Sequence, residues 1–321
     1  MEMQPEDIGP VFGHEAARQE FFAALQAGRM HHGWLLRGPR GVGKARLALR
    51  FAMRLLGDQA DLSASPDPGL TKLVLAGSHP DLRVIRRPVD DKGKQKSEIP
   101  VDSVRELSQF FSLRPALGGY RVAIIDAVDE MNRFGANAVL KTLEEPPSKA
   151  VLFLLSHGEQ VLLPTVRSRC RVIRCGALSE RDEQAVLAQA GHTGGKAQSI
   201  SALAPGRPGR AIELVRGEAD DAGAAIDAVL RAETVEASSL QSALSQAAKS
   251  DDALAISLER LRTYLQRRAL REGDPAAAGD WADAALTVAR ISAEASVLNQ
   301  DRAQTVAAAL QAVSGRIGAG A

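Results

Sequence analysis

A glycine-rich loop that ends in a lysine is the part of the chain best suited to chemistry. The segment Gly38-Pro39-Arg40-Gly41-Val42-Gly43-Lys44-Ala45 matches the phosphate-loop (P-loop) pattern G-x-x-x-x-G-K. Gly38, Gly41 and Gly43 allow backbone N–H groups to turn toward phosphate oxygens, and Lys44 can reach the terminal phosphates. An ordinary glycine-rich turn is the alternative, but an expected strand at 33–36 and an expected helix at 45–56 favour phosphate binding.

The residue after the lysine lacks a group that magnesium needs. In phosphate loops of this kind a Ser or Thr hydroxyl at this position coordinates the magnesium that bridges the β and γ phosphates. Here the residue is Ala45. The sequence therefore predicts weak or vestigial binding of ATP or ADP, with magnesium held differently or not at all.

The elements that must position this loop alternate between strand and helix. Apolar runs predict strands at 33–36, 81–86, 121–125 and 151–155, and helical patterns fall at 14–27, 45–56, 101–111 and 132–144. Segments 57–77 and 90–97 are polar or rich in Gly and Pro, which predicts surface loops. The alternation predicts a parallel sheet with helices on both faces.

Helical patterns alone follow residue 175. We expect a P-loop nucleotide-binding-like domain at 1–175, a small helical domain at 176–215 and a helical oligomerisation domain at 216–321.

Composition excludes several function classes. Hydrophobic residues make up 45% of the chain, but no apolar stretch approaches the roughly 18–20 residues needed to span a bilayer. The acidic beginning also lacks the profile of a secretory signal, so we expect a cytoplasmic protein without membrane contact. Cys170 and Cys175 are the two cysteines, too few for a zinc site of four cysteines, so no metal ligands are assigned. The front half is modestly basic, without the clustered charge of an autonomous DNA-binding protein.

Several further segments resemble bacterial clamp-loader subunits, members of the AAA+ superfamily. The similarity covers about residues 10–215 and rests on Phe12-Gly13-His14, RMHH at 29–32, His79-Pro80-Asp81-Leu82, NAVLKTLEEPP at 137–147, and Ser168-Arg169-Cys170. It implies an α/β AAA+ P-loop domain, a small helical lid and an all-α C-terminal collar. The chain departs from the family at 57–77, where a zinc-binding loop is common and no cysteine occurs, so no zinc is expected.

The resemblance also identifies a second lost catalytic group. In active members an Asp that orders the magnesium shell is followed at once by a Glu that polarises the attacking water. Here Asp126 is followed by Ala127. The two losses imply a subunit without intrinsic ATPase activity, working as a component of a DNA polymerase holoenzyme. The alternatives are an active AAA+ ATPase, in which Glu130 and a water replace the lost groups, and a small-molecule P-loop kinase.

Other site residues follow from the same resemblance. Arg169 is implied to be an arginine finger, presented in trans to the γ-phosphate held by a neighbouring subunit. The alternative is a surface arginine in a basic turn. Arg210 resembles a second sensor that folds the lid over the phosphates, and Ser156 and His157 fall where the family places a polar sensor. The implied partners are the gamma and tau ATPase subunits, the delta subunit, the sliding clamp indirectly, and primer–template DNA through the assembled complex.

Two residue groups invite chemistry that we do not expect. His31 and His32 suggest a metal site, but adjacent histidines point apart in regular structure, so we expect packing near a nucleotide base instead. A second group consists of paired carboxylates, expected to be solvated helix charges: Asp129, Glu130, Glu144 and Glu145.

Overall fold

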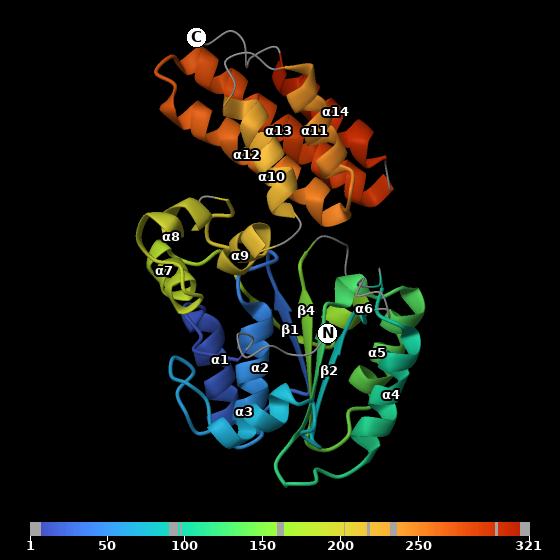
Figure 1. Ribbon diagram of the computed structural model, residues 1–321. Helices are drawn as coiled ribbons and strands as arrows, with labels where there is room; N and C mark the ends of the chain where they lie inside the picture. The colour runs from blue at the N-terminus through green and yellow to red at the C-terminus, as the bar shows by residue number, and fades with distance from the viewer. Residues whose placement is uncertain are drawn as a thin grey trace. The chain divides into compact units, whose positions relative to one another are not determined.

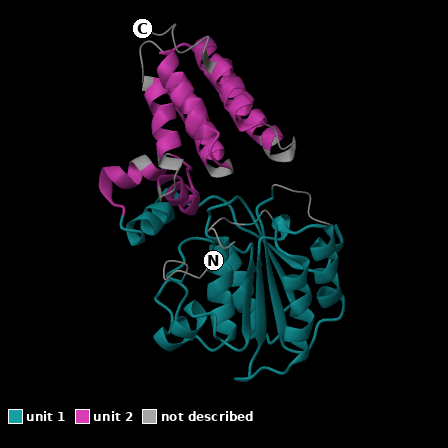
Figure 2. Ribbon diagram, turned by 45° about the vertical axis from the view of Figure 1, so that its right-hand side comes forward, with its two compact units in different colours: residues 1–191 teal, residues 192–321 magenta. Residues whose placement is uncertain are grey.

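The computed structural model describes residues 8–89, 96, 98–158, 164–201, 203–216, 219–231, 236–298 and 301–314. Contacts divide the chain into two compact units, Met1–Gly191 and His192–Ala321, shown in teal and magenta in Figure 2. The three domains expected from the sequence stay a prediction. Among the described residues, no helix is long and apolar enough to cross a membrane.

A five-stranded parallel sheet forms the centre of unit 1 (Figure 1). Its strands are β1 (Gly33–Arg37), β2 (Leu82–Arg86), β3 (Arg121–Asp126), β4 (Ala150–Ser156) and β5 (Arg171–Arg174). They lie in the order β2-β3-β4-β1-β5. The expected parallel sheet with flanking helices is thus confirmed, and the carboxyl ends of the strands form one edge, called the carboxyl edge below.

Alternating side chains along the strands divide the interior of unit 1 into two cores, because successive strand residues face opposite sides. Trp34, Leu36 and Phe153 belong to one core, whereas Leu35 and Leu154 belong to the other. Helices α1 (Glu15–Gln26), α2 (Lys44–Leu55) and α3 (Pro68–Leu75) cover the first face. Helices α4 (Val101–Ser112) and α5 (Arg133–Glu144) cover the second, as Figure 1 shows.

Three short elements differ from the sequence-based expectation. The segment 57–77 is not all loop, because Asp67 accepts a hydrogen bond from the Leu70 N–H and Pro68 starts α3. Strand β5 was not predicted, because Ile173 is its one buried residue. A short helix α6 (Pro164–Arg167) precedes it. Most of the expected loop 90–97 lies outside the described residues.

The described part of unit 1 also contains η2 (Val128–Glu130), a single turn after β3, and α7 (Glu180–Gln189). Unit 2 is helical where the structure describes it. Its helices are α8 (Gly194–Ser201), α9 (Pro208–Arg216), α10 (Ala219–Arg231), α11 (Ala237–Ala247), α12 (Asp251–Arg271), α13 (Pro275–Leu298) and α14 (Arg302–Ser314). One apolar core joins α10 to α14 through residues such as Ile226, Leu265, Val288 and Val306.

Candidate functional site

The phosphate loop begins at the carboxyl edge, directly after β1. The Gly38 N–H donates to the Ser156 carbonyl (3.1 Å), and the Cys175 N–H donates to the Arg37 carbonyl (2.8 Å). A Cβ atom on Gly38 would lie 1.8 Å from the Cys175 carbonyl oxygen. Glycine is therefore required at position 38 by the close approach of the chain after β5, in addition to any role with phosphate.

The rest of the loop has the backbone of a phosphate cradle. Gly41 and Gly43 have φ values of 87° and 97°, a region that L side chains rarely adopt, and α2 starts immediately afterwards. The Lys44 ammonium group donates to the carbonyls of Gly38 (2.7 Å) and Pro39 (2.8 Å), and its side chain is buried. His14 supports the loop, with Nε2 2.8 Å from the Val42 carbonyl oxygen. These residues fit a phosphate group.

The residues at the positions that would hold magnesium and activate water do not fit these roles. Ala45 is half-buried and has no hydroxyl, and Ala127 is fully buried in the first core. Asp126 ends β3 opposite Arg86 at the end of β2, and Arg86 Nε lies 3.3 Å from Asp126 Oδ2. The one expected magnesium-ordering carboxylate is therefore neutralised by an arginine.

A second arginine from the same strand end neutralises Glu130. Arg87 Nε lies 2.8 Å from Glu130 Oε2, and both side chains are about four-fifths buried. Burial raises the pKa of Glu130, whereas Arg87 lowers it. The expectation that Glu130 is a solvated helix charge is wrong. Neither arginine was identified from sequence, because only the strand order shows that the end of the expected strand 81–86 lies beside the end of β3.

Asp129 is likewise partnered rather than solvated. Its Oδ1 accepts from the Ser156 hydroxyl (3.0 Å), and its Oδ2 accepts from the His157 N–H. Ser156 also anchors Gly38 through its carbonyl group. The two residues expected to form a polar sensor thus lie at the carboxyl edge and connect the phosphate loop to η2.

The His157 ring lies in a positively charged setting. Burial, followed by the charges of Lys44, Arg40 and Arg87, lowers its pKa from 6.5 to about 3. Its Nδ1 is buried and has no hydrogen-bond partner among the described residues. The imidazole is neutral at neutral pH, mainly through burial, and a phosphate on the loop would oppose the added effect of the three cations.

This pKa predicts an acid-sensitive fold. Between pH 6.5 and about 3 the unfolded chain binds a proton at His157 that the folded chain excludes, so stability should fall as pH falls through this window. The slope from this residue is at most about 1.4 kcal/mol per pH unit, less for a partly exposed ring. Urea unfolding at pH 7 and at pH 4.5 should show a smaller loss for His157→Gln than for the wild type. Equal losses would contradict the assignment.

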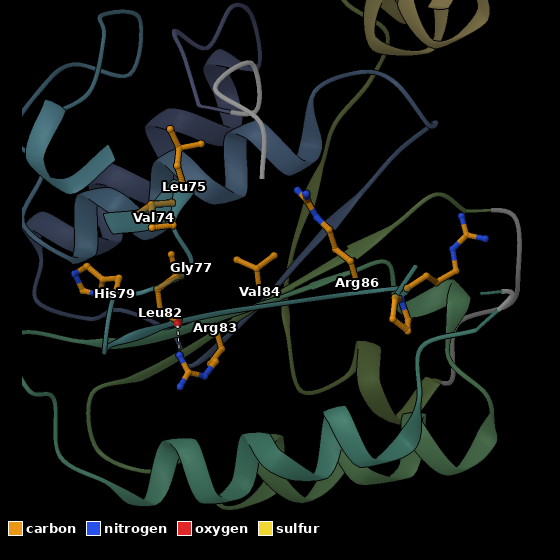
Figure 3. Close-up of a pocket in the computed structure, with 11 residues that line it drawn as sticks. Val74, Leu75, Gly77, His79, Leu82, Arg83, Val84 and Arg86 are labelled. Atoms are coloured by element: carbon orange, nitrogen blue, oxygen red, sulfur yellow. Dashed lines mark hydrogen bonds between the residues drawn. The ribbon is translucent and has the colours of Figure 1, made fainter. Parts of the chain in front are cut away.

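Beside Arg86 lies a cavity of about 520 Å³ between α3 and the edge strand β2. Figure 3 shows Val84 and Arg86 extending from β2 toward the side on which Val74 and Leu75 lie. Arg83 points the opposite way, where its guanidinium lies 5.2 Å from the centre of the Phe110 ring. The two faces of β2 thus use arginine differently, one for packing and one for the ion pair with Asp126.

Arg169 lies at the edge of the sheet opposite the phosphate loop. It precedes β5, whose Arg171 pairs with Trp34 near the start of β1, whereas the loop follows the end of β1. Its side chain is 36% exposed and lies 2.9 Å from Glu144 Oε1. Five strand residues span about 16 Å, so Arg169 cannot reach a phosphate on its own loop. Any phosphate that it contacts belongs to another molecule.

His31 and His32 also lie at this opposite edge. Their rings stack with centroids 4.3 Å apart, and His32 Nε2 lies 3.1 Å from the Leu143 carbonyl oxygen. The expectation that they point apart is wrong, because they lie in an irregular segment and not in a helix or strand. The expectation that they pack near a nucleotide base is also wrong, because this edge lies at the far end of β1 from the phosphate loop. Burial raises the pKa of Cys170 to about 12 and that of Cys175 to about 11, so both thiols stay protonated. No group of three or more His, Cys, Asp or Glu residues that could hold a metal occurs in the described part of the chain.

Arg210 belongs to unit 2, at the start of α9. Its guanidinium forms an ion pair with Glu213 (3.2 Å), and its side chain is 15% exposed. Its expected role as a second sensor stays a prediction.

The family of the chain follows from its match to the family model described as DNA polymerase III, delta subunit, over residues 13–179. The chain belongs to this family. The matched region contains the phosphate loop, the ion pairs of Arg86 and Arg87 at the carboxyl edge, and Arg169. It ends at Ser179, directly before α7.

Three curated relatives are similar to part of this chain. DNA polymerase III subunit delta′ of Pseudomonas aeruginosa is 38% identical over 155 residues, 48% of this chain and 46% of that protein. Subunit delta′ of Escherichia coli is 32% identical over 206 residues, 62% of this chain and 59% of that protein. Subunit tau/gamma of Haemophilus influenzae is 32% identical over 179 residues, 55% of this chain and 25% of that protein. The matched region thus spans about half the length of the delta′ relatives.

Among solved structures, a gamma subunit-related protein of Thermotoga maritima is similar with a TM-score of 0.44 and 15% identity, covering 92% of this chain and 99% of that one.

Proposed function

We propose that the chain is a non-hydrolysing, delta′-type subunit of a DNA polymerase III clamp loader. One observation carries the proposal: every group that should handle magnesium or water at the phosphate loop is missing or neutralised. Ala45 and Ala127 lack the required oxygen atoms, and Asp126 and Glu130 each form an ion pair with an arginine. The named delta′ relatives support the same role.

In this role the subunit assembles with gamma or tau ATPase subunits and with delta. Its helical lid and collar join it to the ring, and the assembled complex loads the sliding clamp onto primer–template DNA. The phosphate loop retains at most weak binding of ATP or ADP through Lys44 and the backbone around Gly41 and Gly43. Arg169 serves the ATP site of a neighbouring subunit, which its exposed position supports.

Steady-state ATP hydrolysis by the isolated chain tests the proposal. We expect the wild-type chain to show no turnover above that of Lys44→Ala, since neither protein can order magnesium or polarise water. The double variant Ala45→Ser with Ala127→Glu should also stay inactive while Arg86 neutralises Asp126. Turnover by the wild type that Lys44→Ala abolishes would overturn the proposal.

An active AAA+ ATPase is the second candidate, favoured by the 32% identity to tau/gamma of Haemophilus influenzae. It requires Glu130 to leave Arg87 and orient the water. The same hydrolysis measurement on Glu130→Gln separates the candidates, because that substitution removes activity only if Glu130 orients the water.

A further inference from the structure

A groove in unit 2 is lined by side chains that none of the proposed roles uses. Its volume is about 750 Å³, and it lies between α8, α10 and α12. Apart from the buried Thr263, the lining residues with polar or planar groups are Gln198, Asp227, Arg260, Tyr264, Arg267 and Arg271. This volume falls within the roughly 300–1,000 Å³ typical of ligand pockets.

Four of these residues form a row on one helix. Arg260, Tyr264, Arg267 and Arg271 succeed one another on α12 at intervals of four, three and four residues. Residues three and four apart lie on the same side of an α-helix, about 5–6 Å from each other between Cβ atoms. The groove therefore has one wall made of three guanidinium groups and a phenol ring.

The first arginine of the row is already compensated. Arg260 forms an ion pair with Asp227 of α10. Its guanidinium lies against the backbone at Gly223, where a Cβ atom would be 2.6 Å from Arg260 Cζ. Arg260 is thus fixed by its own neighbours and adds little net charge to the groove.

The other two arginines are not compensated. Among the residues that the structure describes, Arg267 and Arg271 have neither an ion-pair nor a hydrogen-bond partner, and both are exposed. Elsewhere on α12, Arg262 pairs with Glu259 (2.6 Å) and Arg268 lies 5.3 Å from the centre of the Trp281 ring. In the described part of the chain, three arginines of α12 have no ion-pair partner, and two of them, Arg267 and Arg271, line the groove.

We propose that this groove binds single-stranded DNA, with Arg267 and Arg271 on successive phosphates and Tyr264 beside a base. Guanidinium groups pair with phosphate oxygens bidentately, and flat phenol and guanidinium groups are the side chains on which unpaired bases stack. An acidic peptide would satisfy the two charges but would leave the planar Tyr264 ring without a matching surface. The inference does not depend on the proposed clamp-loader role, because the isolated full chain suffices to test it.

The test is fluorescence anisotropy of a labelled oligo(dT) of about 12 nucleotides with the full chain. Arg267→Gln with Arg271→Gln should weaken binding about tenfold for each lost contact. It should also reduce the slope of log K against log salt by about 1.4 between about 50 and 200 mM NaCl, since each phosphate contributes about 0.7. Arg290→Gln, an exposed arginine on α13, is the matched control and should change neither quantity.

Each other outcome overturns the inference. Binding of oligo(dT) with an unchanged salt slope in the double variant would place the DNA contact elsewhere. Competition by poly-glutamate as strong as by unlabelled oligo(dT) would identify an acidic-peptide site, and displacement by ATP alone would identify a free-nucleotide site. Circular dichroism of the double variant and of Tyr264→Leu confirms folding, and Tyr264→Leu should weaken binding without changing the salt slope.

Discussion

Replacing Arg169 with alanine should lower ATP hydrolysis at one neighbouring site by about 10³-fold or more in a reconstituted clamp loader. An arginine supplied in trans stabilises the charge that develops on the transferred phosphoryl group, and an alanine side chain cannot make this contact. The total rate of ATP hydrolysis by the complex should fall by the fraction that this one site contributes. Single-turnover hydrolysis and clamp loading on primed DNA, with gamma or tau, delta and the clamp present, measure the effect.

The contacts of Arg169 in the isolated chain are compatible with transfer to a partner. Its ion pair with Glu144 is half-exposed, and such pairs contribute about 0.2–1 kcal/mol. Leaving Glu144 therefore costs little compared with the energy of a phosphate contact. Glu144→Gln should leave the activity of the complex within about fivefold of the wild type, by the same estimate.

Two neighbouring arginines provide matched controls for Arg169→Ala. Arg167 and Arg174 are exposed and belong to the same basic segment, so Arg167→Ala and Arg174→Ala remove equal charge, one beside Arg169 and one at the carboxyl end of β5. If either control lowers hydrolysis as much as Arg169→Ala, the segment acts through its general charge and the finger assignment is wrong. Arg169→Lys should behave like alanine, because a lysine lacks the planar fork.

Local patterns in the sequence were sufficient to predict the strands that carry the site. The runs at 121–125 and 151–155 are buried on both faces, which makes them continuously apolar and easy to recognise. The phosphate loop was predictable for a similar reason, since its spacing is local. By contrast, β5 has a single buried residue, Ile173, and four residues give too little periodicity to identify it.

The ion pairs at the carboxyl edge could not be predicted because they depend on strand order. Arg86 meets Asp126 only because β2 lies beside β3, a neighbour relation that no local pattern encodes. The same order places Arg87 beside Glu130. Sequence alone therefore indicated that catalytic oxygens were missing at 45 and 127, but not that the remaining carboxylates were neutralised.

Replacing Asp81 with alanine should destabilise unit 1 by about 3–5 kcal/mol, because it leaves the buried charge of Arg121 without a carboxylate and with only the carbonyl oxygens of Phe110 and Pro80 as acceptors. Asp81 is fully buried and lies 3.2 Å from Arg121 Nε. It also accepts hydrogen bonds from the N–H groups of Ala116 (2.8 Å) and Leu117 (3.0 Å), which fix the segment between α4 and β3. Urea unfolding at neutral pH measures the loss.

The matched control is Asp102→Ala, since Asp102 forms an ion pair with Arg105 at a similar distance (3.0 Å) but is largely exposed. Asp102→Ala should lower the free energy of unfolding by no more than about 0.5 kcal/mol. A comparable small loss for Asp81→Ala would mean that the Phe110 and Pro80 carbonyl groups are sufficient to compensate the charge of Arg121. A large loss of unfolding free energy would show that the family-like segment His79-Pro80-Asp81-Leu82 contributes to stability, although it lies far from any reacting atom. Asp81, directly before β2, fixes the segment that leads into β3, and Arg86, at the carboxyl end of β2, neutralises the carboxylate that hydrolysis would need.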